Sequence, residues 1–217
     1  MRASGDPDLK IYGIFGYPLA HTVSPALQNC AFDHYKLKSF YFAFERPPAR
    51  FRFLLRNLKS LLLEGFNVTV PYKEAVLPYL SRLSPEARLA GAVNTVKRAG
   101  RHWIGYNTDV AGFRFGLRHA HFVPAGKSAV VLGAGGSARA VCFVLGQMGI
   151  REVWIANRTL AHGRRLQKHF GAKYPKVEWN AIPLKRAKLK EALSHAQLLV
   201  NATKVGLGNR DLLLVPS

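Results

Sequence analysis

The stretch that decides the fold is SAVVLGAGGSA, residues 128–138. Its first five residues predict a compact buried strand, and a helix is expected from the glycines through about Met148. The glycines fit the pattern G-x-G-x-x-G/A, which lets the main chain approach a pyrophosphate at the positive end of the following helix. The sequence therefore predicts a dinucleotide-binding turn made by Gly133, Ala134, Gly135, Gly136 and Ser137.

The residues after the next expected strand, over residues 152–156, indicate which dinucleotide is bound. NAD sites usually place Asp or Glu there, about 20 residues beyond the glycines, to bind the ribose 2′-hydroxyl. This chain has Asn157, Arg158 and Thr159 instead. A guanidinium and a hydroxyl can hold the 2′-phosphate of NADP, so NADP is the expected cofactor. The alternative is a surface arginine at Arg158 followed by a helix N-cap at Thr159.

Outward from this turn, the chain alternates strands and helices, which predicts an α/β fold with parallel pairing and right-handed crossovers. Strands are expected over residues 10–15, 38–44, 65–70, 92–97, 102–106, 128–132, 152–156 and 198–200. Ala99 and Gly100 are expected to form the turn between the fourth and fifth of these strands. Helices are expected over residues 50–63, 160–170 and 189–196. We expect an N-terminal α/β substrate domain over residues 1–112 and a Rossmann-like NADP-binding domain, C-terminally incomplete, over residues 113–217. A helix near residues 110–119 would join them.

The charge of the chain is unusually positive. Its 32 Lys and Arg residues outnumber 12 Asp and Glu residues, which gives +20. Residues 113–217 hold 17 basic and 4 acidic residues, a balance of +13. Such a field attracts nucleic acid, membrane surfaces and phosphorylated small molecules without choosing among them. The longest basic stretch, residues 185–190, is typical of the solvated face of an amphipathic helix, so a nucleic-acid partner is not expected.

Composition excludes several other classes. No apolar run approaches the roughly eighteen residues that span a bilayer, and the start has no apolar segment of signal-peptide type, so a cytoplasmic location without membrane contact is expected. Two cysteines cannot build a disulfide framework or a cysteine-based zinc site, and no metal is expected. Cys30 and Cys142 fall on helical patterns and are expected to be small core residues.

Polar side chains gather at the ends of strands in the first domain, at positions where the packing of a hydrophobic core does not require them. Asn67, Thr69 and Lys73 are expected at the end of one strand, Asn94 within another, and Asn107 and Asp109 after a third. Ligands of open α/β sheets bind at the carboxyl ends of strands. Hydroxyls and amides with one lysine and one aspartate suit a small, hydroxylated substrate.

Several blocks, in one order along the chain, resemble the signature blocks of the shikimate dehydrogenase family. They are GYPLAHTVSP (16–25), NVTVPYK (67–73), GAVNT (91–95), GYNTDVAGF (105–113), the glycine turn, NRT (157–159) and NAT (201–203). The resemblance implies NADP-dependent, reversible reduction of 3-dehydroshikimate to shikimate in aromatic amino acid biosynthesis. It also implies a monomer or homodimer that takes a small-molecule substrate.

The resemblance assigns roles residue by residue. Lys73 and Asp109 match the catalytic pair. Thr22 and Ser24 match the two hydroxyls that hold the substrate carboxylate. Further substrate-binding positions are Asn67, Thr69, Asn94 and Asn107, and Thr203 of the NAT block joins the cofactor residues. In this chemistry the lysine ammonium stabilises the developing alkoxide and donates a proton, and the carboxylate orients it.

Departures from the family pattern leave alternatives open. Thr22 replaces the usual serine, which leaves the preference between shikimate and quinate open. His162 stands where a second basic residue is common, which leaves NADP over NAD open. The family pattern continues beyond Ser217 with more sheet, a substrate-contacting glutamine and a helix. The alternatives are a quinate/shikimate dehydrogenase of relaxed specificity and a truncated, non-catalytic relative that binds nucleotide or polyanion. The hydroxyls and the NTD block argue against a methylenetetrahydrofolate dehydrogenase.

Overall fold

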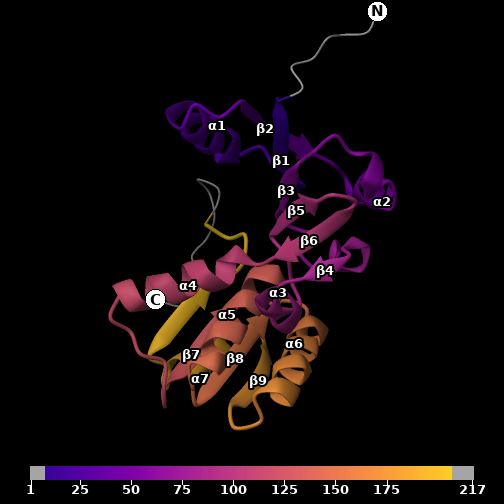
Figure 1. Ribbon diagram of the computed structural model, residues 1–217. Helices are drawn as coiled ribbons and strands as arrows, with labels where there is room; N and C mark the ends of the chain where they lie inside the picture. The colour runs from indigo at the N-terminus through magenta and orange to yellow at the C-terminus, as the bar shows by residue number, and fades with distance from the viewer. Residues whose placement is uncertain (1–7, 207–217) are drawn as a thin grey trace, which may run out of the picture. The chain divides into compact units, whose positions relative to one another are not determined.

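The computed structural model describes residues 8–206 and divides into two compact units, coloured along the chain in Figure 1. The first unit runs to Arg88 and resumes over Val93–Tyr106, and the second holds Leu89–Ala92 and the chain from Asn107 onward. The sequence placed this division at residue 112, whereas the whole of α4 (Thr108–His119) packs on α5 (Gly136–Gln147). Over residues 8–206, none of the helices combines the length and apolar character that a membrane crossing requires.

The sheet of the first unit mixes parallel and antiparallel pairs, in the order β2-β1-β3-β5-β6-β4. Its strands are β1 (Lys10–Gly16), β2 (Ser39–Glu45), β3 (Gly65–Val68), β4 (Arg82–Leu83), β5 (Thr95–Ala99) and β6 (His102–Tyr106). β1, β2 and β3 pair in parallel, while β5 runs antiparallel to both β3 and β6. The antiparallel pairing of β5 with β6 confirms the turn expected at Ala99 and Gly100 between these two strands. Gly100 has φ +60°, and such a short connection can join only antiparallel neighbours.

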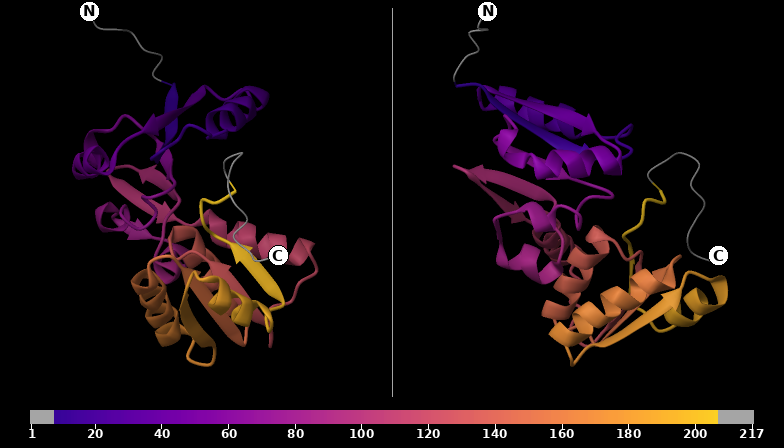
Figure 2. Two further views of the ribbon diagram at one scale, coloured as in Figure 1. Left: turned by 180° about the vertical axis from the view of Figure 1, so that it is seen from behind. Right: turned by 90° about the vertical axis from the view of Figure 1, so that its right-hand side faces the viewer.

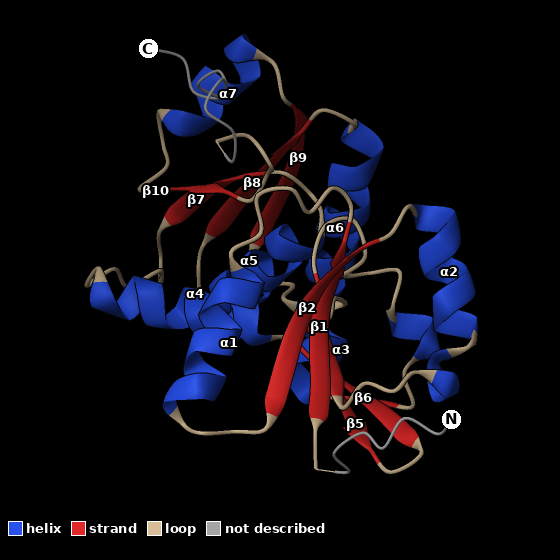
Figure 3. Cartoon of the chain, turned by 90° about the horizontal axis from the view of Figure 1, so that it is seen from above, coloured by secondary structure: helices blue, strands red, loops and turns tan. Residues whose placement is uncertain are grey.

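Two helices cover opposite faces of β1 and β2, as Figure 3 shows. Phe32 of α1 (Ser24–His34) lies 5.5 Å from Tyr12, and Phe51 of α2 (Pro48–Arg56) lies 5.7 Å from Phe15, between ring centroids. Because successive side chains of a strand point to opposite faces, odd and even residues of β1 meet different helices. The expected helix over residues 50–63 is shorter than predicted. It ends at Arg56 and gives way to the 3-10 turn η1 (Leu58–Ser60).

The two cysteines differ in their surroundings. Cys142 is fully buried on α5, and burial raises the pKa of its thiol far above the usual range, so it stays protonated. Cys30 is exposed on α1, a helix without a buried residue, so the expectation of a core position is wrong for it. The connecting elements η2 (Leu77–Tyr79) and α3 (Pro85–Ala90) complete the first half of the chain.

The sheet of the second unit is wholly parallel, in the order β10-β7-β8-β9 (Figure 2). Its elements are β7 (Ser128–Leu132), α5, β8 (Glu152–Asn157), α6 (Leu160–Lys173), β9 (Glu178–Pro183), α7 (Arg186–Leu193) and β10 (Leu198–Asn201). β7 is buried along its whole length, as its apolar sequence predicted. β9 was missed because EWNAIP mixes polar residues with a proline, which is tolerated at the edge of a sheet.

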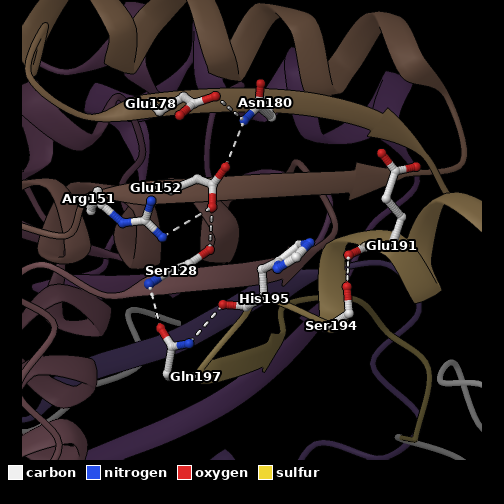
Figure 4. Close-up of polar contacts among 9 residues, drawn as sticks. All are labelled: Ser128, Arg151, Glu152, Glu178, Asn180, Glu191, Ser194, His195 and Gln197. Carbon is white, nitrogen blue, oxygen red and sulfur yellow. Dashed lines mark hydrogen bonds and ion pairs between the residues drawn. The ribbon is translucent and has the colours of Figure 1, made fainter.

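A polar network ties the amino ends of these four strands together, as Figure 4 shows. Ser128 Oγ donates to Glu152 Oε2 at 2.7 Å, and Asn180 Nδ2 donates to Glu152 Oε1 at 3.4 Å. The amide oxygen of Gln197 accepts from the Ser128 N–H at 3.0 Å, and the Gln197 N–H donates to the Ser128 carbonyl at 3.0 Å. Glu152 is only 8% exposed, so its carboxylate depends on these donors.

We expect Ser128→Ala to lower the free energy of unfolding by about 1–3 kcal/mol, because a nearly buried carboxylate would lose its shortest hydrogen bond. Urea unfolding measures the change. Ser194→Ala is the matched control, since Ser194 donates to the Glu191 carbonyl on the exposed end of α7, and we expect a change within about 0.5 kcal/mol. Equal losses in the two variants would show that the network does not stabilise the fold.

Candidate active site

The first unit gathers its predicted substrate residues at one edge of the sheet. β1 ends at Gly16 and β3 at Val68, and β5 begins beside them because Thr95 pairs with Asn67. The residues placed at this edge are Thr22 and Ser24 after β1, Asn67 in β3, Thr69 and Lys73 after β3, and Asn94 before β5. Asn94 was expected within a strand. The strand begins one residue later, so Asn94 lies at the rim of the sheet, where a side chain can reach a ligand.

Asn67 is engaged by a network that the sequence did not reveal. Tyr41 Oη donates to Asn67 Oδ1 at 2.6 Å, and Asn67 Nδ2 donates to the Asn94 carbonyl at 3.1 Å and to Thr95 Oγ1 at 3.0 Å. Thr95 Oγ1 in turn donates to Asn94 Oδ1 at 2.9 Å. Burial raises the pKa of Tyr41, so its phenol remains a donor at neutral pH. Asn67 thus binds the backbone of Asn94 directly and its side chain through Thr95.

Lys73 sits in a turn whose backbone is held on two sides. The Thr69 N–H donates to the Phe15 carbonyl at 2.9 Å, and the Val93 N–H donates to the Lys73 carbonyl at 2.8 Å. The preceding residue, Tyr72, is buried and stacks on Phe51 of α2 with ring centroids 3.9 Å apart. The Lys73 side chain is itself half-buried. These contacts hold the backbone of Lys73 in place, so its side chain extends from a fixed point, as the positioning of a proton donor requires.

The two predicted carboxylate-binding hydroxyls lie at the start of α1. Thr22 Oγ1 accepts from the Ser24 N–H at 3.4 Å, and both residues are half-buried. Val23 is the N-cap of α1, and Ser24 is the first residue of the helix. The positive end of the α1 dipole favours an anion beside these hydroxyls, which agrees with a substrate carboxylate.

In the second unit, Asn107 holds Asp109 at the first turn of α4. Asn107 is 5% exposed, its Oδ1 accepts from the Asp109 N–H at 3.1 Å, and its Nδ2 donates to the Ala92 carbonyl at 2.9 Å. Asn107 is therefore the N-cap of α4, a role not predicted for it. Asp109 is half-buried. Lys73 and Asp109 belong to different units, so their pairing stays a prediction.

The glycine turn has the backbone that its sequence predicted. Gly133 has φ +103°, and a Cβ placed on it would lie 2.9 Å from the Ala202 carbonyl oxygen, so this position requires glycine. Gly135 is the N-cap of α5, which has no acidic residue in its first turn. A phosphate can therefore approach the first N–H groups of α5 beside Ala134, Gly135, Gly136 and Ser137, because no carboxylate of the first turn would repel it. Such a helix start binds phosphate.

The other predicted cofactor residues lie at the same carboxyl edge of the parallel sheet. Asn157 ends β8, where its Nδ2 donates to the Thr159 carbonyl at 2.8 Å, and Arg158 is exposed between them. Thr159 is the N-cap of α6, but its side chain makes no capping hydrogen bond. Beyond β10, Thr203 Oγ1 donates to Asn201 Oδ1 at 2.7 Å, which closes a turn against Gly133. The residues at this edge fit a dinucleotide whose ribose carries a phosphate.

Fold and site together define the class: an α/β protein in which a polar ligand-binding unit precedes a Rossmann-type dinucleotide-binding unit. Two family models match the chain, the shikimate dehydrogenase substrate binding domain over residues 14–96 and shikimate / quinate 5-dehydrogenase over residues 119–206. With the relatives described next, they show that the chain belongs to the shikimate dehydrogenase family. The predicted family and fold class are confirmed.

Relatives match over most of both chains. The shikimate dehydrogenase (NADP(+)) of Geobacter metallireducens is 43% identical over 200 residues, which cover 92% of this chain and 70% of the relative. The shikimate 5-dehydrogenase of Listeria monocytogenes, solved with shikimate and NAD, has a TM-score of 0.82 at 28% identity, covering 100% of this chain and 76% of that one. The shikimate 5-dehydrogenase of Thermus thermophilus, solved with NADP(H) and shikimate, has a TM-score of 0.72 at 38% identity, covering 91% and 70%.

Proposed function

We propose that this protein is an NADP-dependent shikimate dehydrogenase, which reversibly reduces 3-dehydroshikimate to shikimate. The observation that carries the proposal is the match of more than nine tenths of the chain to shikimate dehydrogenases, together with both halves of the site. The sheet edge of the first unit offers hydroxyls and amides for a polyhydroxylated acid. The glycine turn of the second offers backbone N–H groups for a pyrophosphate. The free thiols Cys30 and Cys142 agree with a reducing, cytoplasmic location.

The roles of the substrate residues follow from their surroundings. Thr22 and Ser24 hold the substrate carboxylate at the start of α1, where the helix dipole adds attraction. Thr69 and Asn94 bind ring hydroxyls from the ends of β3 and β5. Asn67 keeps Asn94 in place through Thr95, while Asn107 keeps Asp109 in place as the cap of α4. We thus assign positioning roles to two residues that the resemblance placed in direct contact with substrate.

The reaction requires a hydride and a proton. Bound NADPH supplies the hydride to the ketone carbon. The Lys73 ammonium donates the proton to the oxygen, which becomes the alcohol of shikimate, and the Asp109 carboxylate orients substrate and lysine. In the reverse direction Lys73 accepts that proton. The half-buried setting of Lys73 strengthens its interaction with the developing negative charge, since less water screens it.

The test is the formation of NADPH by the purified protein with shikimate, with quinate as the second substrate. We expect turnover with shikimate, and the ratio of kcat/KM for the two substrates measures the preference between shikimate and quinate that Thr22 leaves open. Comparable kcat/KM values for shikimate and quinate would favour a quinate/shikimate dehydrogenase of relaxed specificity. Binding of NADP without turnover of either substrate would overturn the proposal in favour of a non-catalytic nucleotide-binding relative.

Arg158 is expected to select NADP over NAD, since it is exposed at the end of β8, where no carboxylate would repel a 2′-phosphate. Arg158→Ala should raise the KM for NADP by about tenfold or more, while the KM for NAD changes little, because a charge-assisted contact to phosphate is lost. Lys168→Ala, at an exposed position further along α6, is the control for a general loss of positive charge. A similar rise in both variants would assign the preference to the overall field of the unit.

A further inference from the structure

A groove beside α2, lined by none of the predicted substrate residues, has the features of a second ligand site. It encloses about 630 Å³, within the range of small-molecule sites. Its apolar lining comes from Ala49, Phe53, Leu54 and Leu61. The Phe53 side chain is 71% exposed, although large aromatic residues usually bury most of their surface. α2 already packs on the sheet through Phe51 and Leu55, so Phe53 is not needed for that contact.

Charge at the groove is of one sign. Arg46 and Arg50 line it next to the start of α2, and Asn57 lines it beyond the end of the helix. Residues 46–63 contain five basic residues and no acidic one. The acidic residues on either side of this segment, Glu45 and Glu64, do not line the groove, and the Glu45 carboxylate accepts from the Leu19 N–H at 2.8 Å. A second copy of this chain would bring the same arginines and the same +20 charge, so an anion is the complementary occupant.

We propose that this groove binds a small aromatic carboxylate. The carboxylate meets Arg50 and those N–H groups of Arg46 that do not bind the Glu45 carbonyl, and the ring lies against Phe53 and Leu54. A hydroxyl at the far end donates to Asn57 Oδ1, because Asn57 Nδ2 already donates to the Phe53 carbonyl. The spacing agrees with one small molecule: Arg50 and Asn57 are seven residues apart, a rise of about 10 Å along a helix. A phenyl ring with a three-carbon acid and a para hydroxyl spans that length.

The groove is connected to the predicted catalytic lysine through backbone and ring contacts. The Arg46 N–H donates to the Gly16 carbonyl at 3.2 Å, and the hydroxyl of Tyr72 donates to the Arg46 carbonyl. Phe51 of α2 stacks on Tyr72, the neighbour of Lys73. Arg46 and α2 therefore contact both the groove and the turn that carries Lys73.

The experiment uses the whole protein with 3-(4-hydroxyphenyl)propanoate as the probe. Calorimetry without NADP or shikimate should show saturable binding to the wild type. Binding should weaken by about tenfold in Arg50→Ala, and equally for the wild type with the corresponding propanamide, which lacks the charge. Arg52→Ala removes the same charge from an exposed position of α2 outside the groove, and should change the Kd by about twofold at most at moderate ionic strength. Because binding is measured alone, an inactive enzyme would refute the proposed function and leave this test intact.

Three outcomes would overturn the groove proposal. The first is an absence of saturable binding to the wild type. The second is an equal loss in Arg50→Ala and Arg52→Ala, which would mean diffuse charge attraction. The third is displacement of the probe by shikimate in simple competition, which would place the probe in the substrate site at the edge of the sheet.

Discussion

Lys73→Ala should lower kcat for shikimate oxidation by about 10²- to 10⁴-fold, the usual contribution of a positioned general acid or base. The lysine sits half-buried in a turn whose backbone is fixed by the Val93 N–H, so alanine removes the proton-transfer group without disturbing its support. NADP affinity should stay unchanged, because the glycine turn lies in the other unit. Steady-state kinetics and NADP titration measure the two effects separately.

Lys97→Ala is the matched control for this prediction. Lys97 lies on β5 of the same unit and is exposed, so the variant loses the same charge and the same side chain away from the carboxyl edge. We expect kcat within about twofold of the wild type, as for surface substitutions in general. If Lys73→Ala kept a tenth or more of the activity, or if both lysine variants lost it together, Lys73 would not be the proton donor.

Gly133→Ala should weaken NADP binding by about tenfold or more and lower the free energy of unfolding by about 1–3 kcal/mol. The φ of +103° is strained for any side chain, and the added Cβ would lie 2.9 Å from the carbonyl oxygen of Ala202. Relief requires a shift of the turn that carries Thr203, and therefore of the edge that meets the pyrophosphate. Denaturant unfolding and nucleotide titration measure the two effects.

A glycine in a permissive position provides the comparison. Gly116 lies inside α4, its φ is outside the left-handed region, and a Cβ there would meet no atom within 4 Å. Gly116→Ala should raise stability by about 0.5–1 kcal/mol, because alanine loses less conformational entropy in a helix. A destabilisation of similar size in both variants would mean that the contact with Ala202 does not decide the outcome at Gly133.

Local pattern determined the nucleotide-binding half of the fold. The apolar run of β7, the glycines after it and the helix that follows are adjacent in sequence, and their periodicity and backbone requirements act over a few residues. The same holds for Asn157, Arg158 and Thr159 at the end of β8. The prediction that Lys73 and Asp109 are catalytic came from the family resemblance. Each of these residues lies in a short block whose pattern can be recognised without knowing the fold.

Tertiary structure alone decided what several of those residues do. Asn67 is hydrogen-bonded to Tyr41, which is 26 residues away in sequence, and to the Asn94 carbonyl. Its contacts therefore depend on which strands pair. The sequence predicted the turn that joins β5 to β6 but not the pairing of β5 with β3, and only this antiparallel register places Thr95 beside Asn67. The need for glycine at Gly133 likewise depends on Ala202, which β10 brings against β7. The physical reason is common to all three: a sequence pattern records the backbone preference of neighbours, whereas hydrogen bonds and close contacts between distant residues exist only after the sheet has formed.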